Sequence, residues 1–412
     1  GIIIFITLQR YQLLSDTQLL IGLGLSIAVG LIGASRIKMI DMPQGVALLN
    51  GFGGGASALV GLLVFGQSHT SFERITASLA IVVGFATLSG SLVAAAKLHR
   101  IISQKAIILK FHHQFTSLWL IVSTLTIALA GWYQHPSLAL IGAGASLLFG
   151  YYFAIRVGGA DMPITISLLN SLSGIGGAIA GMAIGDPFLV AVGGLVGSAG
   201  LLLTQIMCQA MNRSLREILL GQTAIAITKP DVDVKPQVTI NPEVSYETVA
   251  ARLQAAQRIM IVPGYGMALS QAQHAIKQIS DTLVNQQKDV KYAIHPVAGR
   301  MPGHMNVLLA EVDVDYEDLL EMDEANQQFE DIDLVLVVGA NDVINPAANT
   351  AADTPIYGMP ILNVDMAKHV VICNFDRQPG YSGVPNTLYD QDSVSLLLGD
   401  AKTSLEALLK LL

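Results

Sequence analysis

The feature that most constrains this chain is a series of long apolar stretches that fills its first half. Each stretch is close to the length of roughly 20 apolar residues that a helix needs to cross a bilayer. We expect seven full spans, preceded by the remainder of another at residues 1–9. The expected spans are residues 18–34, 44–66, 74–96, 117–133, 137–155, 164–184 and 186–207. Residues 1–208 are therefore predicted to form a multi-pass helical membrane bundle.

Charge is distributed unequally along the 412 residues. Residues 1–225 carry 11 Lys and Arg against six Asp and Glu, whereas residues 226–412 carry 12 against 25. Such an asymmetry indicates two parts in different solvents. An acidic second part would repel nucleic acid, and the presence of only two cysteines excludes a disulfide scaffold. We expect a linker at residues 209–244 and a soluble domain at 245–412.

Basic residues occur in alternate loops of the membrane part. Lys and Arg lie in the loops 35–43, 97–116 and 156–163 and directly after the last span, while the intervening loops hold at most Arg10 and Arg74. Because short cytoplasmic loops carry an excess of Lys and Arg, the soluble domain is predicted to lie on the cytoplasmic side.

A pattern that begins with Asp-Met-Pro occurs twice, from Asp41 to Asn50 and from Asp161 to Asn170. Of 21 aligned positions, nine are identical. Pro in the first turn with Asp before it favours a helix start. The two asparagines lie about two turns inside their spans, where a buried amide must be hydrogen-bonded. Either they join helices, or they line a polar route and orient water.

The second half alternates short apolar runs with helical patterns. This alternation predicts a doubly wound, Rossmann-like α/β domain with a parallel sheet. Gly264 and Gly266 follow the first run directly, as in a turn that holds a dinucleotide, although Leu269 replaces the third glycine of that fingerprint. We expect strands at 258–263, 290–294, 333–338, 360–364 and 369–374, and helices at 245–257 and 268–287.

Several of these segments together resemble the beta subunit family of the proton-translocating NAD(P) transhydrogenases. The resemblance covers essentially the whole chain, and its longest run extends from His295 to Glu311. In the second half it also rests on residues 264–268 (GYGMA), 339–342 (GAND), 345–348 (NPAA), 355–362 (PIYGMPIL) and 399–402 (GDAK). In the first half it rests on residues 161–170 and 206–213 (IMCQAMNR).

The resemblance implies a membrane enzyme that works in two subunits. This chain would bind NADP(H), and an alpha subunit would bind NAD(H). Hydride would pass directly between the nicotinamides of NADH and NADP+, in the Si-specific, Re-face sense, without a catalytic side chain and coupled to proton translocation. The chain would be active only with its alpha subunit, as a dimer of alpha–beta units surrounded by lipid. The implied location is the bacterial inner (plasma) membrane, with a mitochondrial or other organellar inner membrane as the alternative.

The residue patterns and the resemblance together indicate site residues. Expected in the proton pathway or its coupling are Asn50, Asn170, Asp161, His295 and Asp342, although His295 could be a loop cap and Asp342 a turn residue. No metal ligand is expected. The expected cofactor contacts are Gly264, Tyr265, Gly266, Met267, Ala268, Val297, Ala298, Gly299, Arg300, Met301, Pro302, Gly339, Ala340, Asn341, Asp342, Val343, Gly358, Met359, Asn374, Phe375, Asp376, Arg377, Gln378, Pro379, Gly380, Tyr381, Asp400 and Ala401.

Two departures from the family pattern bear on function. The family commonly has Lys-Arg-Ser where this chain has Asn374 to Asp376. Since Asp accepts a hydrogen bond from a free ribose hydroxyl and repels a 2′-phosphate, Asp376 alone favours NAD, but Arg377 beside it offers a cation for NADP(H), which we expect. Many members have a membrane His where this chain has Asn50, which cannot carry a proton.

An ion channel or transporter gated by a nucleotide-sensing Rossmann domain is the competing hypothesis. The repeat and the glycine-rich helices are compatible with it, but the long run from His295 to Glu311 favours the enzyme. A degenerate subunit that serves only assembly is a third hypothesis.

Overall fold

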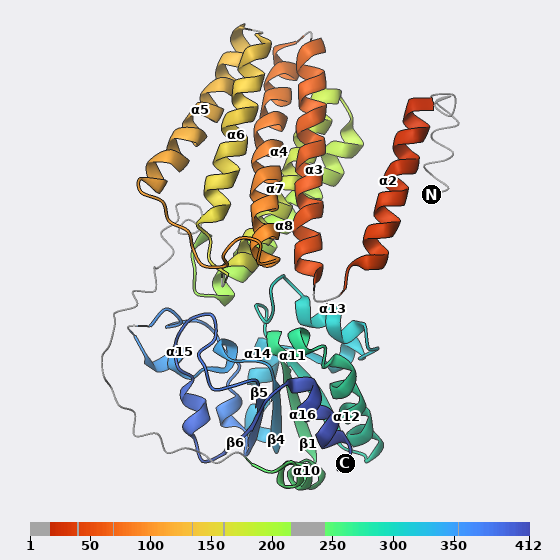
Figure 1. Ribbon diagram of the computed structural model, residues 1–412, viewed down its shortest axis with the longest axis vertical. Coiled ribbons are helices and arrows are strands. Elements are labelled where there is room, and N and C mark those ends of the chain that lie inside the picture. Colours follow the sequence, from red (N-terminus) through yellow and green to blue (C-terminus); the bar gives the residue numbers. More distant parts are fainter. Residues whose placement is uncertain are drawn as a thin grey trace.

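The computed structural model describes residues 17–38, 41–68, 70–133, 135–159, 161–215, 244–352 and 354–412. Over these ranges the chain forms two units that follow one another along its long axis, a bundle of long helices and an α/β unit (Figure 1). This is the predicted fold class. The truncated span expected at residues 1–9 and residues 216–243 of the expected linker lie outside the described ranges.

The bundle has seven helices among the described residues. Six of them, α3 to α8, are long and apolar enough to cross a membrane, whereas the apolar part of α2, Leu20–Arg36, is shorter. The expectation of a full span at 18–34 is therefore met only by this shorter apolar helix. The helices are α2 (Thr17–Arg36), α3 (Met42–Gln67), α4 (Ser71–Leu98), α5 (His112–Tyr133), α6 (Pro136–Ile155), α7 (Met162–Ile184) and α8 (Pro187–Ala210).

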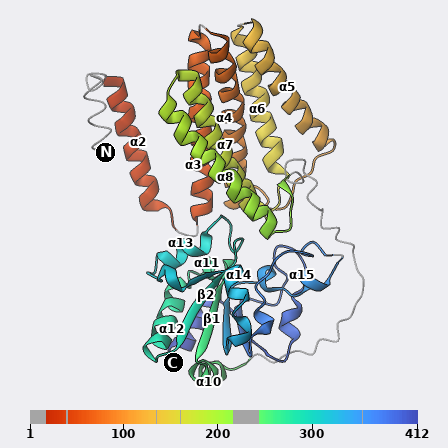
Figure 2. The ribbon, with the colours of Figure 1, turned by 180° about the vertical axis from the view of Figure 1, so that it is seen from behind.

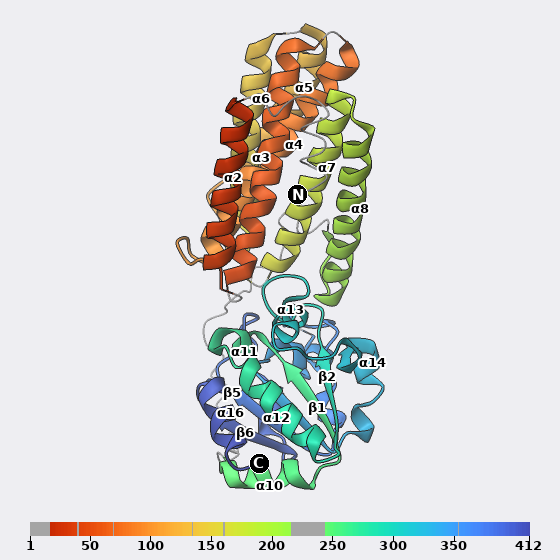
Figure 3. The same ribbon diagram turned by 90° about the vertical axis from the view of Figure 1, so that its right-hand side faces the viewer.

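Small residues allow these helices to pack closely. Helix α4 packs against α3, α5, α6 and α7, and α7 pairs with α8 on one side of the bundle (Figures 2 and 3). A Cβ on Gly84 would lie 2.3 Å from the carbonyl oxygen of Gly54, and one on Gly150 would lie 2.2 Å from that of Ala86. Such close backbone contact is typical of helices that associate in lipid.

The two copies of the repeat open α3 and α7. Asp41 and Asp161 occupy the N-cap positions with Pro in the first turn, as predicted, but neither carboxylate makes a capping hydrogen bond. The two helices pack against each other. The repeat is therefore a packed pair of helices with equivalent starts.

Lys97, in the last turn of α4, is fully buried. Its ammonium donates to the carbonyl oxygens of Lys105 at 3.2 Å and Val157 at 2.7 Å, and also to that of Ile155. Three acceptors match the three protons of an ammonium group. Lys97 thus joins the loop after α4 to the end of α6 and the loop that follows, on the side of the bundle that faces the α/β unit (Figure 1).

The α/β unit is built on a six-stranded sheet in which each pair of neighbouring strands is parallel. The order is β3-β2-β1-β4-β5-β6, so the direction of winding reverses between β1 and β4, as in doubly wound folds. The strands are β1 (Arg258–Pro263), β2 (Asp289–Ile294), β3 (Leu319–Glu321), β4 (Leu334–Val338), β5 (Val370–Asn374) and β6 (Val394–Leu398). The α-helices of the unit are α10 (Tyr246–Ala255), α11 (Tyr265–Ser270), α12 (Gln273–Asn285), α13 (His304–Ala310), α14 (Met322–Asn326), α15 (Ala347–Thr350) and α16 (Ala401–Leu409).

The two faces of the sheet bury separate clusters of apolar side chains. Strands β4 and β5 are buried along their whole length, which explains why they are continuously apolar rather than alternating. On one face, Leu336 shares a cluster with residues of α12 and α16, such as Ile276 and Leu405. On the other face, Val335 shares a cluster with Phe329.

The expected strand at 360–364 is wrong. Pro360 has no N–H, and its carbonyl oxygen accepts a hydrogen bond from His295 Nε2 at 2.9 Å. The N–H of Leu362 donates to the carbonyl oxygen of Val343 at 2.9 Å, outside any strand. The segment is apolar because Ile361 and Leu362 are buried, and its polar backbone groups are satisfied by loops.

Two further strands and a helix break were not predicted. Strand β3 has only three residues, and β6 lies at an edge of the sheet. The expected helix at 268–287 is interrupted at Gln271, whose φ of +55° places it in the left-handed region and separates α11 from α12.

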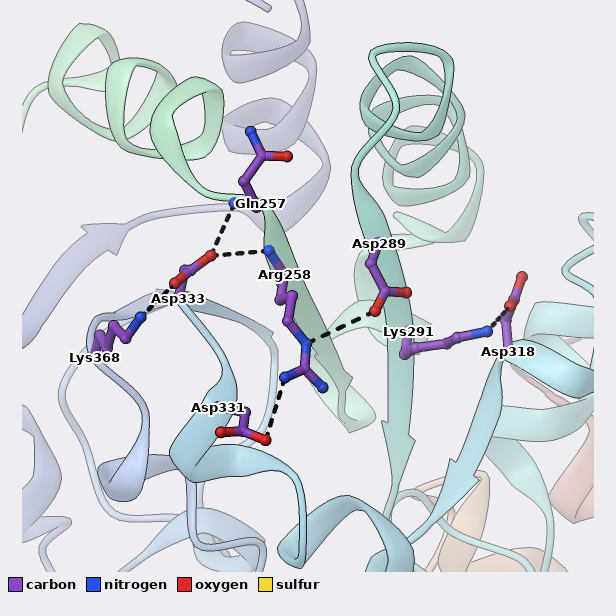
Figure 4. Close-up of polar contacts among 8 residues, drawn as sticks. All are labelled: Gln257, Arg258, Asp289, Lys291, Asp318, Asp331, Asp333 and Lys368. Atoms are coloured by element: carbon purple, nitrogen blue, oxygen red, sulfur yellow. Dashed lines mark hydrogen bonds and ion pairs between the residues drawn. The ribbon is translucent and has the colours of Figure 1, made fainter.

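Charged residues gather where the strands begin, at the amino-terminal edge of the sheet (Figure 4). The Asp333 carboxylate accepts a hydrogen bond from the ammonium of Lys368 at 2.8 Å. It also accepts hydrogen bonds from the N–H groups of Gln257 and Arg258 at 2.9 and 3.0 Å. These hydrogen bonds, that of Lys368 foremost, hold the pKa of Asp333 below its ordinary value. Arg258 also pairs with Asp331 at 3.3 Å. Acidic residues at this edge therefore serve the fold.

Candidate functional site

The opposite edge, where the strands end, carries the candidate site at the point of reversal between β1 and β4. The N–H of Gly264 donates to the carbonyl oxygen of Val338, and that of Gly266 donates to Gly339, each at 2.8 Å. A Cβ on Gly264 would lie 2.3 Å from the carbonyl oxygen of Gly339. The glycines are therefore required by the contact between the two strand ends, which is the usual place for a ligand in such sheets.

Four loops meet at this edge, and we call them the carboxyl-edge loops: residues 264–266, 295–303, 339–342 and 375–383. The Arg300 guanidinium carbon lies 4.3 Å from the centre of the Tyr265 ring and 5.4 Å from that of Tyr381. The Arg300 guanidinium also donates to the Tyr381 hydroxyl. Residues expected from three separate segments are thus brought together around one buried cation.

His295 is buried at the start of the second carboxyl-edge loop. Its Nε2 lies 2.9 Å from the carbonyl oxygen of Pro360, and its Nδ1 accepts the N–H of Val297 at 3.2 Å. Burial lowers the pKa of His295 to about 4, with the Pro360 carbonyl opposing the shift. The ring is therefore neutral near pH 7, with its proton on Nε2, and it joins the loop 295–303 to Pro360.

His304 was not among the expected site residues. Its Nδ1 accepts the N–H of Arg300 at 3.1 Å, and a Cβ on Gly299 would lie 2.6 Å from the His304 Cβ. Burial, and then the charge of Arg300, lower the pKa of His304 to about 4. A histidine at the end of a glycine-rich run was the signal available in the sequence, and its role is to shape the loop that holds Arg300.

Asp342 lies half-buried beside the end of β4. The Ser382 hydroxyl donates to its Oδ1 at 2.6 Å, and the Ser382 N–H donates to its Oδ2 at 3.1 Å. Burial raises the pKa of Asp342 above its ordinary value, although the hydroxyl and the N–H groups of Ser382 and Tyr381 oppose the shift. Among the described carboxylates of these loops, Asp342 is thus the one whose protonated form is favoured by burial.

The loop after β5 contains the departure from the family pattern. Asn374 donates to the carbonyl oxygen of Ala340 at 2.8 Å and to the Tyr389 hydroxyl at 2.6 Å, so its amide serves the fold. The Asp376 carboxylate accepts the N–H of Gln378 at 2.9 Å. Phe375 is largely exposed.

Arg377 is the cation of this loop. Its guanidinium lies 3.6 Å from the Asp390 carboxylate and donates to the carbonyl oxygen of Tyr389 at 3.2 Å. An arginine has five N–H donors in a planar fork, so these contacts leave it capacity to bind a phosphate.

Three more of the expected cofactor residues, Gly358, Met359 and Asp400, have structural roles. Gly358 has a φ of +76°, and Met359 is buried. Asp400 caps α16 by accepting the N–H of Thr403 at 3.0 Å, and that bond is the first cause of its lowered pKa.

The carboxyl-edge loops face the helical bundle (Figure 1). Val297 packs against a buried cluster formed by Ile164, Met207 and Cys208 of α7 and α8. A Cβ on Gly159 would lie 3.7 Å from the ring of Tyr381. The candidate site therefore lies against the ends of the membrane helices.

Three of the expected site residues, Asn50, Asn170 and Asp161, belong to the bundle. Asn50 is buried, and its amide lies 3.5 Å from the carbonyl oxygen of Ile166 in α7, so it bridges α3 and α7. Asn170 is half-buried. Asp161 lies 3.8 Å from the Arg213 guanidinium, and burial raises the pKa of Asp161 while Arg213 opposes the shift.

Within the described residues, no group of three or more His, Cys, Asp or Glu side chains is arranged to hold a metal ion. The cationic donors at the candidate site are instead the guanidinium groups of Arg300 and Arg377, which suit an anionic ligand.

Comparison with known proteins assigns this architecture to a family. The family model described as NAD(P) transhydrogenase beta subunit matches residues 1–411. Two relatives, both named NAD(P) transhydrogenase subunit beta and both from Rhodospirillum rubrum, are 37% identical to the chain over 429 aligned positions. Each alignment covers 100% of this chain and 90% of the relative. The chain therefore belongs to the NAD(P) transhydrogenase beta subunit family.

Proposed function

We propose that this chain is the NADP(H)-binding subunit of a proton-translocating transhydrogenase. Its alpha partner binds NAD(H), and hydride passes between the two nucleotides while the bundle moves a proton. The observation that carries the proposal is the position of the carboxyl-edge loops. They converge at the reversal point of a doubly wound sheet and also rest on α7 and α8 through Val297.

The bound nucleotide supplies the hydride chemistry through its nicotinamide. The chain contributes position and exclusion of water. Gly264, Gly266 and Gly339 let the turns after β1 and β4 meet beside the ligand, and Arg300 between Tyr265 and Tyr381 offers a fixed cation. The hydride step then needs no general acid from this chain.

For the coupling step we propose Asp342 as the titratable group at the nucleotide. Its carboxylate lies among the carboxyl-edge loops, and burial favours its protonated form. His295, with its pKa lowered to about 4, acts better as a neutral link between loops than as a proton carrier. In the bundle we propose that Asn50 and Asn170 orient water and that Asp161 lies at the route's nucleotide end.

The proposed orientation places the α/β unit in the cytoplasm of a bacterium, below its inner membrane. In its support, the basic segment that contains Lys97, at the end of α4, and Arg100 and Lys105, in the following loop, lies at the end of the bundle that faces the α/β unit (Figure 1). Cytoplasmic loops carry such an excess of cations. The assembly that we propose is a dimer of alpha–beta units in lipid, with Si-specific, Re-face transfer and activity only in the presence of alpha.

The nucleotide preference can be tested on the full chain in detergent. We expect NADPH to bind more tightly than NADH. Replacement of Arg377 by Ala should weaken NADPH binding about 10- to 100-fold, the value of one charge-assisted hydrogen bond, and leave NADH binding nearly unchanged. Lys368→Ala, which removes a cation at the opposite edge of the sheet, is the control.

Equilibrium titration of nucleotide fluorescence measures these affinities. Tighter binding of NADH by the parent chain, or equal weakening of both nucleotides by Arg377→Ala, would contradict the assignment of NADP(H) to this subunit.

A further inference from the structure

The turn directly after α8 carries a polar contact that the proposed function does not use. Asn212 has a φ of +48°, a left-handed conformation that Asn adopts more readily than most residues. Its backbone N–H donates to the carbonyl oxygen of Gln209 at 3.0 Å. Its side-chain amide donates to the carbonyl oxygen of Tyr357 in the α/β unit at 2.8 Å.

The next residue of the α/β unit is fitted to this contact. A Cβ on Gly358 would lie 2.5 Å from the Asn212 side-chain nitrogen, and Gly358 itself has a φ of +76°. A side chain at 358 would therefore be strained and would also displace the amide. The N–H of Gly358 donates to the carbonyl oxygen of Ala348 at 2.8 Å, which connects the contact to the interior of the unit.

The same end of α8 also contacts the carboxyl-edge loop 295–303. Met207 and Cys208, one turn before Asn212, pack with Val297. The two loops held in this way are joined to each other, because His295 Nε2 bonds to the carbonyl oxygen of Pro360. The end of α8 thus contacts two loops that are hydrogen-bonded to each other.

The end of α8 is in turn fixed to the start of α7. Arg213, adjacent to Asn212, lies 3.8 Å from Asp161 at the N-cap of α7. The contact with Tyr357 is therefore connected, through Arg213, to the start of α7.

We propose that Asn212 is a positioning residue, through which α8 sets the conformation of residues 355–360 and so the affinity of the candidate site for its nucleotide. Asn212 touches no reacting atom in this scheme and acts through the Tyr357 carbonyl. The affinity part of the proposal rests on the proposed function, whereas the conformational part does not.

Asn212→Gly is the direct test, because Gly accepts the left-handed backbone and removes only the amide. We expect the full chain to bind NADPH about fivefold more weakly, the value of one net hydrogen bond of about 1 kcal/mol. Gln209→Ala, on the exposed side of the same turn, should leave the affinity unchanged. An affinity within twofold of the parent would overturn the proposal.

A double-mutant cycle separates positioning from general destabilisation, whatever happens to the thermal midpoint. Gly358→Ala should weaken NADPH binding at least threefold more in the parent than in the Asn212→Gly background, because the clash with the amide is present only in the parent. Equal effects in the two backgrounds would overturn the proposal.

Hydrogen exchange of the full chain tests the conformational part without any nucleotide. In Asn212→Gly, the amides of Gly358 and Leu362 should exchange about fivefold faster than in the parent or in Gln209→Ala, as expected for the loss of one such hydrogen bond. Unchanged exchange would overturn the inference even if NADPH binds. Failure of the parent to bind NADPH would refute the proposed function alone.

Discussion

At the scale of single residues, burial rather than residue type decides which titratable groups of the site can respond to pH. His295 and Asp342 were both candidates from the sequence. In the structure His295 has its two ring nitrogens satisfied by backbone groups and a pKa lowered to about 4, whereas burial raises the pKa of Asp342. The sequence showed that both could titrate but not in which direction each is shifted.

The shift of His295 predicts a loss of stability in acid. Its folded pKa of about 4 lies below the ordinary 6.5, so the unfolded chain binds the proton first as the pH falls from about 6.5 to about 4. Stability should decrease over this window, by on the order of 1–3 kcal/mol from His295. His304, also lowered to about 4, adds to the effect.

Thermal unfolding of the full chain at pH 7 and pH 5, followed by circular dichroism, measures this loss. His295→Asn keeps a donor for Pro360 but cannot titrate, so its midpoint should fall less between the two pH values. Identical falls in the parent and the variant would show that His295 is not the group responsible.

Other site residues could be placed by the sequence but not given a role. Gly264 and Gly339 were expected to contact a nucleotide, and the structure adds that they are needed for contact between two strand ends. Asn374 was expected at the cofactor, yet its amide is bonded to Ala340 and Tyr389. Long-range partners of this kind, such as Ser382 for Asp342, leave no local signal in a sequence.

At the scale of elements, the segments with strong periodicity were predicted well. The membrane helices α3 to α8 and the strands β1, β2, β4 and β5 lie close to their expected positions. The errors occurred where tertiary contacts decide. Residues 360–364 are apolar but bond to His295 and Val343 instead of a strand, and β3 is too short to show a pattern.

The turn after β4 predicts a sharp difference between two left-handed glycines. Gly339 has a φ of +70°, and a Cβ there would lie 2.3 Å from the Met267 nitrogen. Gly303 has a φ of +68° with nothing within 4 Å. Gly339→Ala should therefore cost about 2–5 kcal/mol, and Gly303→Ala only about 1–2 kcal/mol.

Chemical unfolding of the full chain, monitored through hydrogen exchange of the buried amides in β1 and β4, distinguishes these two variants. The matched backbone angles make Gly303→Ala the control for strain alone. Equal destabilisation by both substitutions would mean that contact between the β1 and β4 turns does not stabilise the unit.

At the scale of the whole molecule, the unequal charge of the two halves corresponds to two units of different construction. Their order and class could be predicted from composition and pattern. Their contact could not be predicted, because it depends on single residues with distant partners. Val297 meets α7 and α8, and Asn212 meets Tyr357, only after folding. The proposed coupling between nucleotide and proton depends on that contact.

We propose that nucleotide chemistry at the α/β unit drives proton movement through the bundle. The most direct measurement uses proteoliposomes that contain this chain and its alpha partner, supplied with NADPH and an oxidised NAD analogue. We predict that hydride transfer builds a pH difference across the vesicle membrane. An uncoupler should abolish this difference and accelerate turnover. Vesicles without alpha should show neither hydride transfer nor a pH difference. Hydride transfer with no pH change and no response to the uncoupler would contradict the account, as would proton flux through this chain alone.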